Sequence, residues 1–264
     1  MLEKVNLDKK LSHKKYRLVA RDLQRRLFEL EKTCWDRKIA SVVVFEGWDA
    51  AGKGTAIATL TARLDPRGFK LHPIQPPRSH ELNHPWLYRF WLRTPNYGEM
   101  AIFDRSWYGR VLADRVEGLV AEPEWRAAYR DILEFERMLA DDGVVIVKFW
   151  LHIGKREQKR RFKELSADPL RNWHVTPEDW ERHRKYDQYL FAVEEMLELS
   201  DSDYGPWTVI EATSRWYARK KIFEVLIRAL ESRLGELAPP HVPASAEDEQ
   251  EAELRAAIDK SEEK

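Results

Sequence analysis

Residues 42–55 read V-V-V-F-E-G-W-D-A-A-G-K-G-T. The apolar, β-rich run at 42–45 predicts a short strand, residues 47–55 form a glycine-containing loop, and residues 56–64 have the pattern of a helix. A strand, a glycine loop and a helix in this order form the context that a phosphate-binding loop requires. The stretch therefore predicts an α/β fold organised around a phosphate-binding loop.

The residue types in this loop suit phosphate. Gly47 and Gly52 allow the backbone to turn tightly with its N–H groups pointing inward, and the following helix adds its partial positive end. Lys53 contributes a mobile positive charge, and the Thr55 hydroxyl can reach a magnesium ion. Gly54 separates these two residues, a departure from G-x-x-x-x-G-K-[ST] that nucleoside monophosphate kinases share. The alternative is a glycine-rich turn with an unrelated lysine. The predicted phosphate-binding residues are Gly47, Ala50, Ala51, Gly52, Gly54 and Thr55.

A second apolar strand, predicted at 100–103, ends at Asp104 in the segment D-R-S-W-Y-G-R. An acidic residue that closes such a strand is typical of the carboxylate that holds the metal in phosphate-loop enzymes. Asp49 adds another carboxylate inside the loop itself. Carboxylates, phosphate oxygens and waters suit Mg²⁺, which we expect as the cofactor. The alternatives are a helix-start cap for Asp49 and a turn residue for Asp104.

Composition limits the classes of partner. The 264 residues include 34% charged residues but carry a formal net charge of zero, so we expect neither a nucleic acid nor a membrane surface as a general partner. Cys34 is the single cysteine, which excludes an internal disulfide and a cysteine zinc cluster. The apolar run at 144–153 is too short to span a bilayer. A cytoplasmic location is expected.

The remaining pattern alternates strands and helices, which is typical of a parallel α/β sheet. The apolar run at 144–151 predicts the central parallel strand. Further strands are predicted at 69–74 and 207–212. Helices are predicted in 1–40 and at 84–93, 122–139, 155–163, 176–199 and 214–234.

The predicted helix at 155–163 carries six basic residues in nine, K-R-E-Q-K-R-R-F-K. Arg156, Arg160 and Lys163 share one face of such a helix. A basic helix between a strand and a loop predicts a lid that closes over phosphates. The alternative is a solvated helix with no ligand.

Several motifs together resemble polyphosphate kinase family 2. They are F-E-G-W-D-A-A-G-K-G-T (45–55), F-D-R-S-W-Y-G-R-V-L (103–112), E-F-E-R-M-L (134–139), F-W-L-H-I (149–153) and the aromatic-basic stretch 171–180. The resemblance covers about residues 15–235, and the combination of D-A-A-G-K-G with D-R-S-W-Y is specific to the family.

The resemblance implies a P-loop kinase fold like that of thymidylate kinase, with a parallel sheet of about five strands, flanking helices and a helical lid. Pattern and composition predict a basic N-terminal helical extension at 1–40 and a disordered acidic tail at 238–264. The P-loop kinase domain would lie between them at 41–237, with its lid at about 155–176. The resemblance also implies Mg²⁺-dependent phosphoryl transfer between inorganic polyphosphate and adenine or guanine nucleotides, AMP to ADP or ADP to ATP. We expect a homo-oligomer.

Residue roles follow from the motif positions. Asp49 and Asp104 would surround the metal and phosphates, and Lys53 and Arg105 would act on the transferred group. Further phosphate or nucleotide contacts are expected at Arg89 and Arg110. The polyphosphate contacts of the lid would be Arg156, Arg160, Arg161, Arg171 and His174. Many relatives carry lysine where this chain has His174, so the charge of the lid is expected to depend on pH.

The variants W-D-A-A-G-K-G and S-W-Y-G-R-V-L look most like the branch that phosphorylates AMP. Two other functions remain open. An ATP-dependent nucleoside monophosphate kinase would share the loop, the strand acid and the lid, although the basic run at 155–163 fits an extended polyanion better. A non-catalytic polyphosphate-binding module would not need both Asp49 and Asp104.

Overall fold

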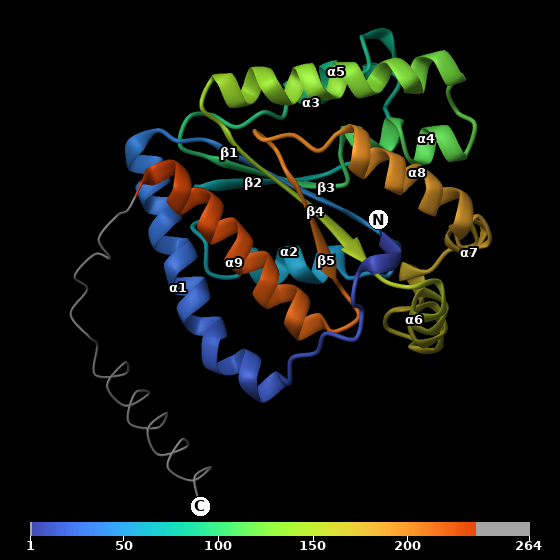
Figure 1. The fold of residues 1–264 in the computed structure, drawn as a ribbon, viewed down its shortest axis with the longest axis horizontal. Helices are drawn as coiled ribbons and strands as arrows, with labels where there is room; N and C mark the ends of the chain where they lie inside the picture. Colours follow the sequence, from blue (N-terminus) through green and yellow to red (C-terminus); the bar gives the residue numbers. More distant parts are fainter. Residues whose placement is uncertain (1, 236–264) are drawn as a thin grey trace, which may run out of the picture. The chain divides into compact units, whose positions relative to one another are not determined.

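The computed structural model describes residues 2–235 (Figure 1). The predicted acidic tail at 238–264 lies outside the described residues. A five-stranded sheet forms the centre, with strand order β2-β3-β1-β4-β5 and every pair parallel. The strands are β1 (Ser41–Gly47), β2 (Phe69–Pro73), β3 (Met100–Asp104), β4 (Val145–His152) and β5 (Trp207–Glu211).

Strand β1 occupies the centre of the sheet and has six consecutive buried residues, as expected for a strand covered on both faces. The strand predicted as central at 144–151 is β4, which is the neighbour of the central strand and lies between β1 and β5. The prediction of its central position is therefore corrected. The register pairs Phe45 with Asp104 and Gly47 with Leu151. The carboxyl ends of β3, β1 and β4 therefore meet at one edge, where ligands bind in open parallel sheets.

Helices cover both faces of the sheet (Figure 1). Three of them, α1, α2 and α9, gather on one face, and α3, α5 and α8 gather on the other. The helices are α1 (His13–Arg37), α2 (Lys53–Thr61), α3 (Tyr88–Trp91), α4 (Ala113–Val116), α5 (Glu122–Asp141), α6 (Lys155–Ala167), α7 (Pro177–Arg184), α8 (Tyr186–Leu199) and α9 (Arg215–Leu234). Short 3₁₀ turns are η1 (Leu2–Lys4), η2 (Glu81–Asn83), η3 (Trp107–Arg110) and η4 (Asn172–His174).

The predicted helix at 84–93 is wrong in extent, because only Tyr88–Trp91 is α-helical. His84 is extended, with φ −124° and ψ 161°, as the residue before a proline prefers. The aromatic side chains still reach the core, since Phe90 packs edge-on against Trp107 at 5.8 Å between ring centroids. Only Phe90 of this stretch is buried, so the apolar pattern does not mark one buried face of a helix.

The predicted helix at 176–199 is two helices, α7 and α8, which separate at Lys185. Its predicted start at Thr176 is confirmed, and Asp179 accepts a hydrogen bond from the Thr176 N–H at 2.8 Å. The break allows α7 to run beside the strand ends while α8 packs against the core (Figure 1). Within residues 2–235, no helix is long and apolar enough to cross a membrane.

Candidate active site

The loop after β1 adopts a compact turn that its neighbours hold in place. Gly47 has φ 145°, and a Cβ atom there would lie 2.5 Å from the Leu151 carbonyl oxygen, so only glycine fits. Gly52 has φ 103°, and Ala50 takes a left-handed conformation with φ 60°. The Trp48 N–H donates to the Leu151 carbonyl at 3.3 Å, which ties the loop to the end of β4.

Lys53 is the first residue of α2 and turns its side chain back over the loop. Its Nζ donates to the Gly47 carbonyl at 2.7 Å and to the Trp48 carbonyl at 3.2 Å. Burial lowers the pKa of Lys53, and the neighbouring Arg105 lowers it further. The ammonium group thus stands at the positive end of α2, where an anion is favoured.

The extra glycine in the G-K-G-T ending is accommodated in the first turn of α2. A Cβ atom on Gly54 would meet nothing within 4 Å, so packing does not require glycine there. The Thr55 hydroxyl donates to the Gly52 carbonyl at 2.9 Å and is exposed. Thr55 therefore caps the loop in this structure, while its hydroxyl oxygen stays accessible.

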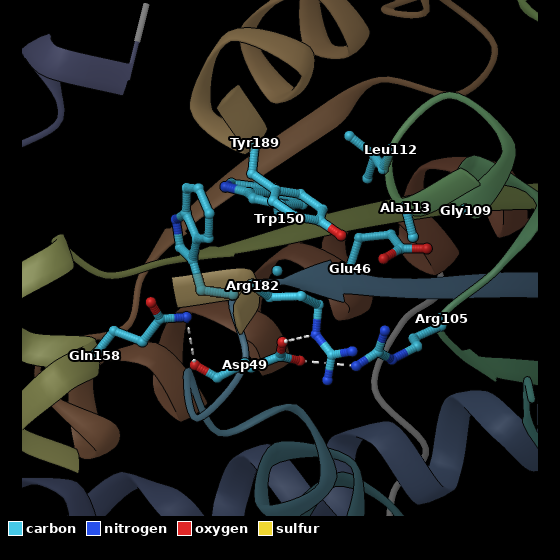
Figure 2. Close-up of a pocket in the computed structure, with 12 residues that line it drawn as sticks. Glu46, Asp49, Arg105, Gly109, Leu112, Ala113, Trp150, Gln158, Arg182 and Tyr189 are labelled. Atoms are coloured by element: carbon cyan, nitrogen blue, oxygen red, sulfur yellow. Dashed lines mark hydrogen bonds and ion pairs between the residues drawn. The ribbon is translucent and has the colours of Figure 1, made fainter. Parts of the chain in front are cut away.

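Asp49 is held between two arginines from distant parts of the chain (Figure 2). Its Oδ1 accepts from Arg105 at 2.7 Å, and its Oδ2 accepts from Nε of Arg182 on α7 at 2.8 Å. Burial opposes ionisation, but Arg105, Lys53 and Arg182 together lower the pKa of Asp49. The structure thus joins the loop, the segment after β3 and α7 around one carboxylate.

Asp104 ends β3 beside the loop, as predicted, and its backbone pairs with Phe45. Its carboxylate raises the pKa of Lys53 and that of Glu46, so it lies within electrostatic reach of both. Arg105 follows with φ 64°, a left-handed conformation that is uncommon for arginine. The Arg105 N–H donates to the Phe45 carbonyl at 3.0 Å, which turns the chain sharply at the sheet edge.

A small cleft of about 70 Å³ opens beside these groups (Figure 2). Trp150 and Tyr189 form its aromatic wall, and Asp49, Arg105 and Arg182 face it. Further lining residues are Glu46, Gly47, Trp48, Gly109, Leu112, Ala113 and Gln158. The cleft therefore combines a charged mouth with a largely apolar interior, a combination typical of small-molecule sites.

Helix α6 contacts the loop directly through two side chains. Arg161 donates to the carbonyls of Ala50 and Ala51 at 3.0 and 3.1 Å, and also to those of Ala212 and Thr213. Gln158 donates to the Asp49 carbonyl at 3.2 Å. The predicted role of Arg161 as a polyphosphate contact stays a prediction, because these backbone carbonyls occupy its guanidinium in this structure.

The other basic residues of the predicted lid are exposed. Arg160 pairs with Glu157 and Glu164 on the same helix, and Arg171 pairs with Asp168 at 2.5 Å. The ring of His174 stacks on Trp173 at 3.6 Å between centroids. Arg156 is exposed on α6. These side chains lie at the surface, where an extended anion could exchange with their carboxylate partners.

Arg89 and Arg110 are not brought to the Asp49 cluster. Arg89 donates to the Gln75 carbonyl at 2.7 Å and lies 3.5 Å from Glu81. Arg110 lies 3.7 Å from Asp114. Burial raises the pKa of Asp114 and both arginines oppose that rise, so they form a neighbouring basic group beside α4.

Among the charged and amide side chains that line the cleft, sequence reasoning missed Arg182, Glu46 and Gln158. It also missed the aromatic wall of Trp150 and Tyr189. Glu46 is 6% exposed and accepts from the Ser106 hydroxyl at 2.8 Å, and burial raises its pKa. Its position directly before the loop could have drawn attention to it. Arg182 had no local signal, because nothing in the sequence of α7 shows which of its faces meets Asp49.

Comparisons with known proteins agree with this geometry. A sequence model described as polyphosphate kinase 2 matches residues 10–237. The chain is 40% identical over 232 residues to a polyphosphate:AMP phosphotransferase of Pseudomonas aeruginosa, covering 88% of this chain and 47% of that protein. It is 37% identical over 210 residues to an AMP/ADP-polyphosphate phosphotransferase of Meiothermus ruber, covering 79% of each.

Solved structures show the same architecture. A polyphosphate kinase 2 from Pseudomonas aeruginosa superposes with a TM-score of 0.86 at 40% identity, covering 90% of this chain and 51% of that chain. A polyphosphate kinase 2 from Arthrobacter aurescens gives 0.86 at 27% identity, covering 98% and 93%. The predicted P-loop kinase fold is thus confirmed. The chain spans less than half the length of the polyphosphate:AMP phosphotransferases that it matches.

Proposed function

The chain belongs to the polyphosphate kinase 2 family, and on that premise we propose that it transfers phosphoryl groups between inorganic polyphosphate and a nucleotide. The observation that carries the proposal is the cluster of Lys53, Arg105 and Arg182 around Asp49 at the phosphate-binding loop. In the direction of nucleotide synthesis, an oxygen of the nucleotide phosphate bonds to the terminal phosphorus of polyphosphate. The bond to the rest of the polymer breaks, and the polymer leaves one unit shorter.

The residues of the cluster can perform this reaction by electrostatics and positioning alone. The acceptor phosphate already carries a negative oxygen near neutral pH, so the reaction needs no general base. Lys53 and the two arginines would stabilise the charge on the transferred group, in a site that keeps them fixed before the reaction begins. Phosphate oxygens would replace Asp49 as partners of these arginines when substrate binds.

Mg²⁺ is the proposed cofactor. Among residues 2–235, no three His, Cys, Asp or Glu side chains lie close enough to hold a metal by themselves. The donor set nevertheless fits, because Mg²⁺ is commonly held by one or two carboxylates together with substrate phosphates and waters. Asp49, which its cationic neighbours keep ionised, and Asp104 would supply the carboxylates, and the ion would neutralise charge on the phosphates.

Helix α6 and the segment to His174 would form the polyphosphate-binding surface. Arg156, Arg160, Arg171 and His174 are exposed there. The first two lie on α6, which contacts the loop through Arg161, and the other two follow it. A polymer of phosphates carries about one negative charge per unit, so it needs a continuous row of cations or counterions. Arg161 would act by holding this surface against the loop.

AMP is the proposed preferred acceptor. The support comes from the motifs at 48–54 and 106–112 and from relatives named polyphosphate:AMP phosphotransferases at 40–45% identity. Initial rates with AMP and with ADP, measured with one polyphosphate donor, test this choice. Faster use of ADP would reverse it.

One assay separates the proposed function from its nearest alternative. The protein is incubated with Mg²⁺ and AMP or ADP, with either polyphosphate or ATP as the donor. We expect turnover with polyphosphate, whereas use of ATP alone would favour an ordinary nucleoside monophosphate kinase. Binding of polyphosphate without any transfer would favour a binding module.

We also propose three properties of the chain as a whole. They are a domain division into 1–40, 41–237 and 238–264, a homo-oligomeric state and a cytoplasmic location. Sedimentation of the purified chain tests the oligomeric state. The nucleotide base remains adenine or guanine, and parallel assays with AMP and GMP address it.

A further inference from the structure

We propose that the buried ion pair between Glu136 and Lys148 is a positioning device that fixes Arg105 for phosphoryl transfer, an inference that rests on the proposed function. Neither residue lines the cleft. Both are 0% exposed, and neither is part of the proposed chemistry. Their hydrogen bonds lead directly into the segment that carries Arg105.

The ion pair is fully hydrogen-bonded. Lys148 Nζ lies 2.8 Å from Glu136 Oε2, and it also donates to the Tyr108 hydroxyl at 2.8 Å and to the Ser200 carbonyl at 2.9 Å. Glu136 Oε1 accepts from the Trp107 indole at 3.0 Å and from the Tyr108 hydroxyl at 2.8 Å. Two charges from α5 and β4 therefore hold two consecutive aromatic residues of η3.

Stability alone is a weak reason for this arrangement. Removing two charges from water offsets most of their mutual attraction, and apolar side chains of similar volume often stabilise a core equally well. The pair instead fixes the orientation of two neighbouring side chains. The donors and acceptors of Glu136 and Lys148 allow only one placement of Trp107 and Tyr108. A well-satisfied buried network specifies a unique geometry.

The ion pair and its hydrogen bonds to Trp107 and Tyr108 form an anchor, which continues along the backbone to Arg105. The Ser106 hydroxyl accepts from the Tyr108 N–H at 3.2 Å and donates to Glu46 at 2.8 Å. Arg105 then holds φ 64°, a conformation that non-glycine residues keep only when their surroundings impose it. Every residue from Arg105 to Tyr108 is thus fixed, and the Arg105 guanidinium reaches Asp49 as a result.

Loosening the anchor would let residues 105–108 relax and carry the guanidinium away from the phosphates. A misplacement of about 1 Å at a reacting centre can lower the rate about 10²-fold. The effect would travel through Arg105, so it should vanish when Arg105 is absent. A residue that only stabilises the fold would not show this dependence.

A double-mutant cycle tests the proposal, with kcat, KM and melting temperature measured for Glu136→Gln, Arg105→Ala and the double variant. The amide keeps the shape of Glu136 but removes its charge. We expect Glu136→Gln to lower kcat about tenfold or more in the wild-type background and less than about threefold in the Arg105→Ala background. The loss of melting temperature should be the same in both backgrounds. Tyr108→Phe, which deletes only the linking hydroxyl, repeats the cycle if Glu136→Gln does not fold.

Leu226→Ala provides the matched control, since Leu226 is 0% exposed on α9 and its apolar side chain forms none of the hydrogen bonds of this network. It should lower the melting temperature and leave kcat near the wild-type value. Equal losses of kcat from Glu136→Gln in both backgrounds, or no loss at all, would overturn the positioning role. A fully active Arg105→Ala variant would overturn it together with the proposed role of Arg105. A wild-type protein that transfers no phosphoryl group would instead overturn the proposed function.

Discussion

Asp49 shows how a single residue can be prepared for a ligand that binds beside it. Its two oxygens face Arg105 and Arg182, which reach it from the segment after β3 and from α7. These cations lower the pKa of the carboxylate despite its burial, which suits the metal-binding role proposed for it. Arg182 also pairs with Asp179 on α7, so Asp49 is one of two carboxylates that hold this guanidinium.

Lys53 and Asp104 are expected to be required for turnover but not for folding. Lys53→Ala removes the ammonium group at the start of α2, and Asp104→Asn removes a proposed metal ligand. Each should lower kcat about 10²-fold or more, the scale for losing one preorganised electrostatic contact. Circular dichroism should show a folded protein in both cases. Turnover close to that of the wild type in either variant would contradict the assignment.

Arg182→Gln is expected to affect both rate and pH dependence. Losing one charge-assisted hydrogen bond should lower kcat/KM about tenfold or more. Removing a cation also raises the pKa of Asp49, so activity should begin to fall at a higher pH on the acid side of the profile. Arg184→Gln is the control on the same helix, because Arg184 is exposed and pairs with Glu181. If activity falls at the same acidic pH in wild type and Arg182→Gln, Arg182 does not control the ionisation of Asp49.

The residues of the loop were predictable because their spacing is local. Asp49, Lys53 and Asp104 each stand at a fixed distance from a strand end, and parallel strands bring those ends together. Arg182 was not predictable, because its contact with Asp49 spans 133 positions and depends on the angle of α7. Buried hydrogen bonds such as that of Glu46 likewise leave no periodic signal.

At the level of elements, all five strands were predicted within about two residues, since β-branched runs bounded by turn residues carry a clear signal. Helices were predicted less well where tertiary packing decides. The stretch 84–93 is apolar enough to suggest a helix, but Pro85 and the aromatic contacts allow only one α-helical turn, at Tyr88–Trp91. The break at Lys185 follows from the need to place α7 beside the loop.

Helix α1 is attached to the turn before β2 by a buried carboxylate. Glu31 is 4% exposed, and its Oε2 accepts from the Asp65 N–H at 2.8 Å. Burial raises the pKa of Glu31 to about 7. The turn is close-packed there, because a Cβ atom on Gly68 would lie 2.6 Å from Glu31 Oε1.

This carboxylate should make stability depend on pH. The folded protein holds the Glu31 proton up to about pH 7, whereas the unfolded chain releases it near pH 4.5, so the free energy of unfolding should fall as pH rises through this window. Glu31→Gln should remove that decline and be more stable than wild type at pH 8 by about 3 kcal/mol. Denaturant unfolding between pH 4 and 8 measures the free energy of unfolding at each pH. Asp36→Asn is the control, because Asp36 is an exposed carboxylate of α1. Parallel curves for wild type and Glu31→Gln would rule out this titration.

At the level of the whole molecule, a net charge of zero coexists with a locally positive site. Acidic residues balance the basic ones over the whole chain, while Lys53, Arg105, Arg182 and the exposed arginines of α6 gather at one edge of the sheet. Attraction of polyanions should therefore come from this edge and not from the molecule as a whole.

The salt dependence of the reaction should show whether polyphosphate binds at this edge of the sheet. For long polyphosphate, the logarithm of kcat/KM should fall steeply with the logarithm of salt concentration, because bound cations displace counterions from the polymer. Replacing Arg156 and Arg160 by Gln should raise KM for polyphosphate more than KM for nucleotide and reduce the salt slope by about one unit per contact. Arg126→Gln with Arg130→Gln, on exposed positions of α5, should leave the slope unchanged. Equal slopes for both double variants would argue against the lid as the polymer-binding surface.

The attachment of the phosphate-binding loop to later parts of the chain has a consequence for synthesis on the ribosome. The loop rests on Leu151 and on Arg161, and Arg161 follows Ala50 by 111 positions. Every strand pairing is parallel, so no ladder closes through a hairpin, and each waits for a distant segment to emerge. A nascent chain that ends before β4 therefore contains the loop motif and Asp104 but lacks the later residues that hold the loop in its folded conformation. The cluster around Asp49 can first assemble when α7, which carries Arg182, has emerged.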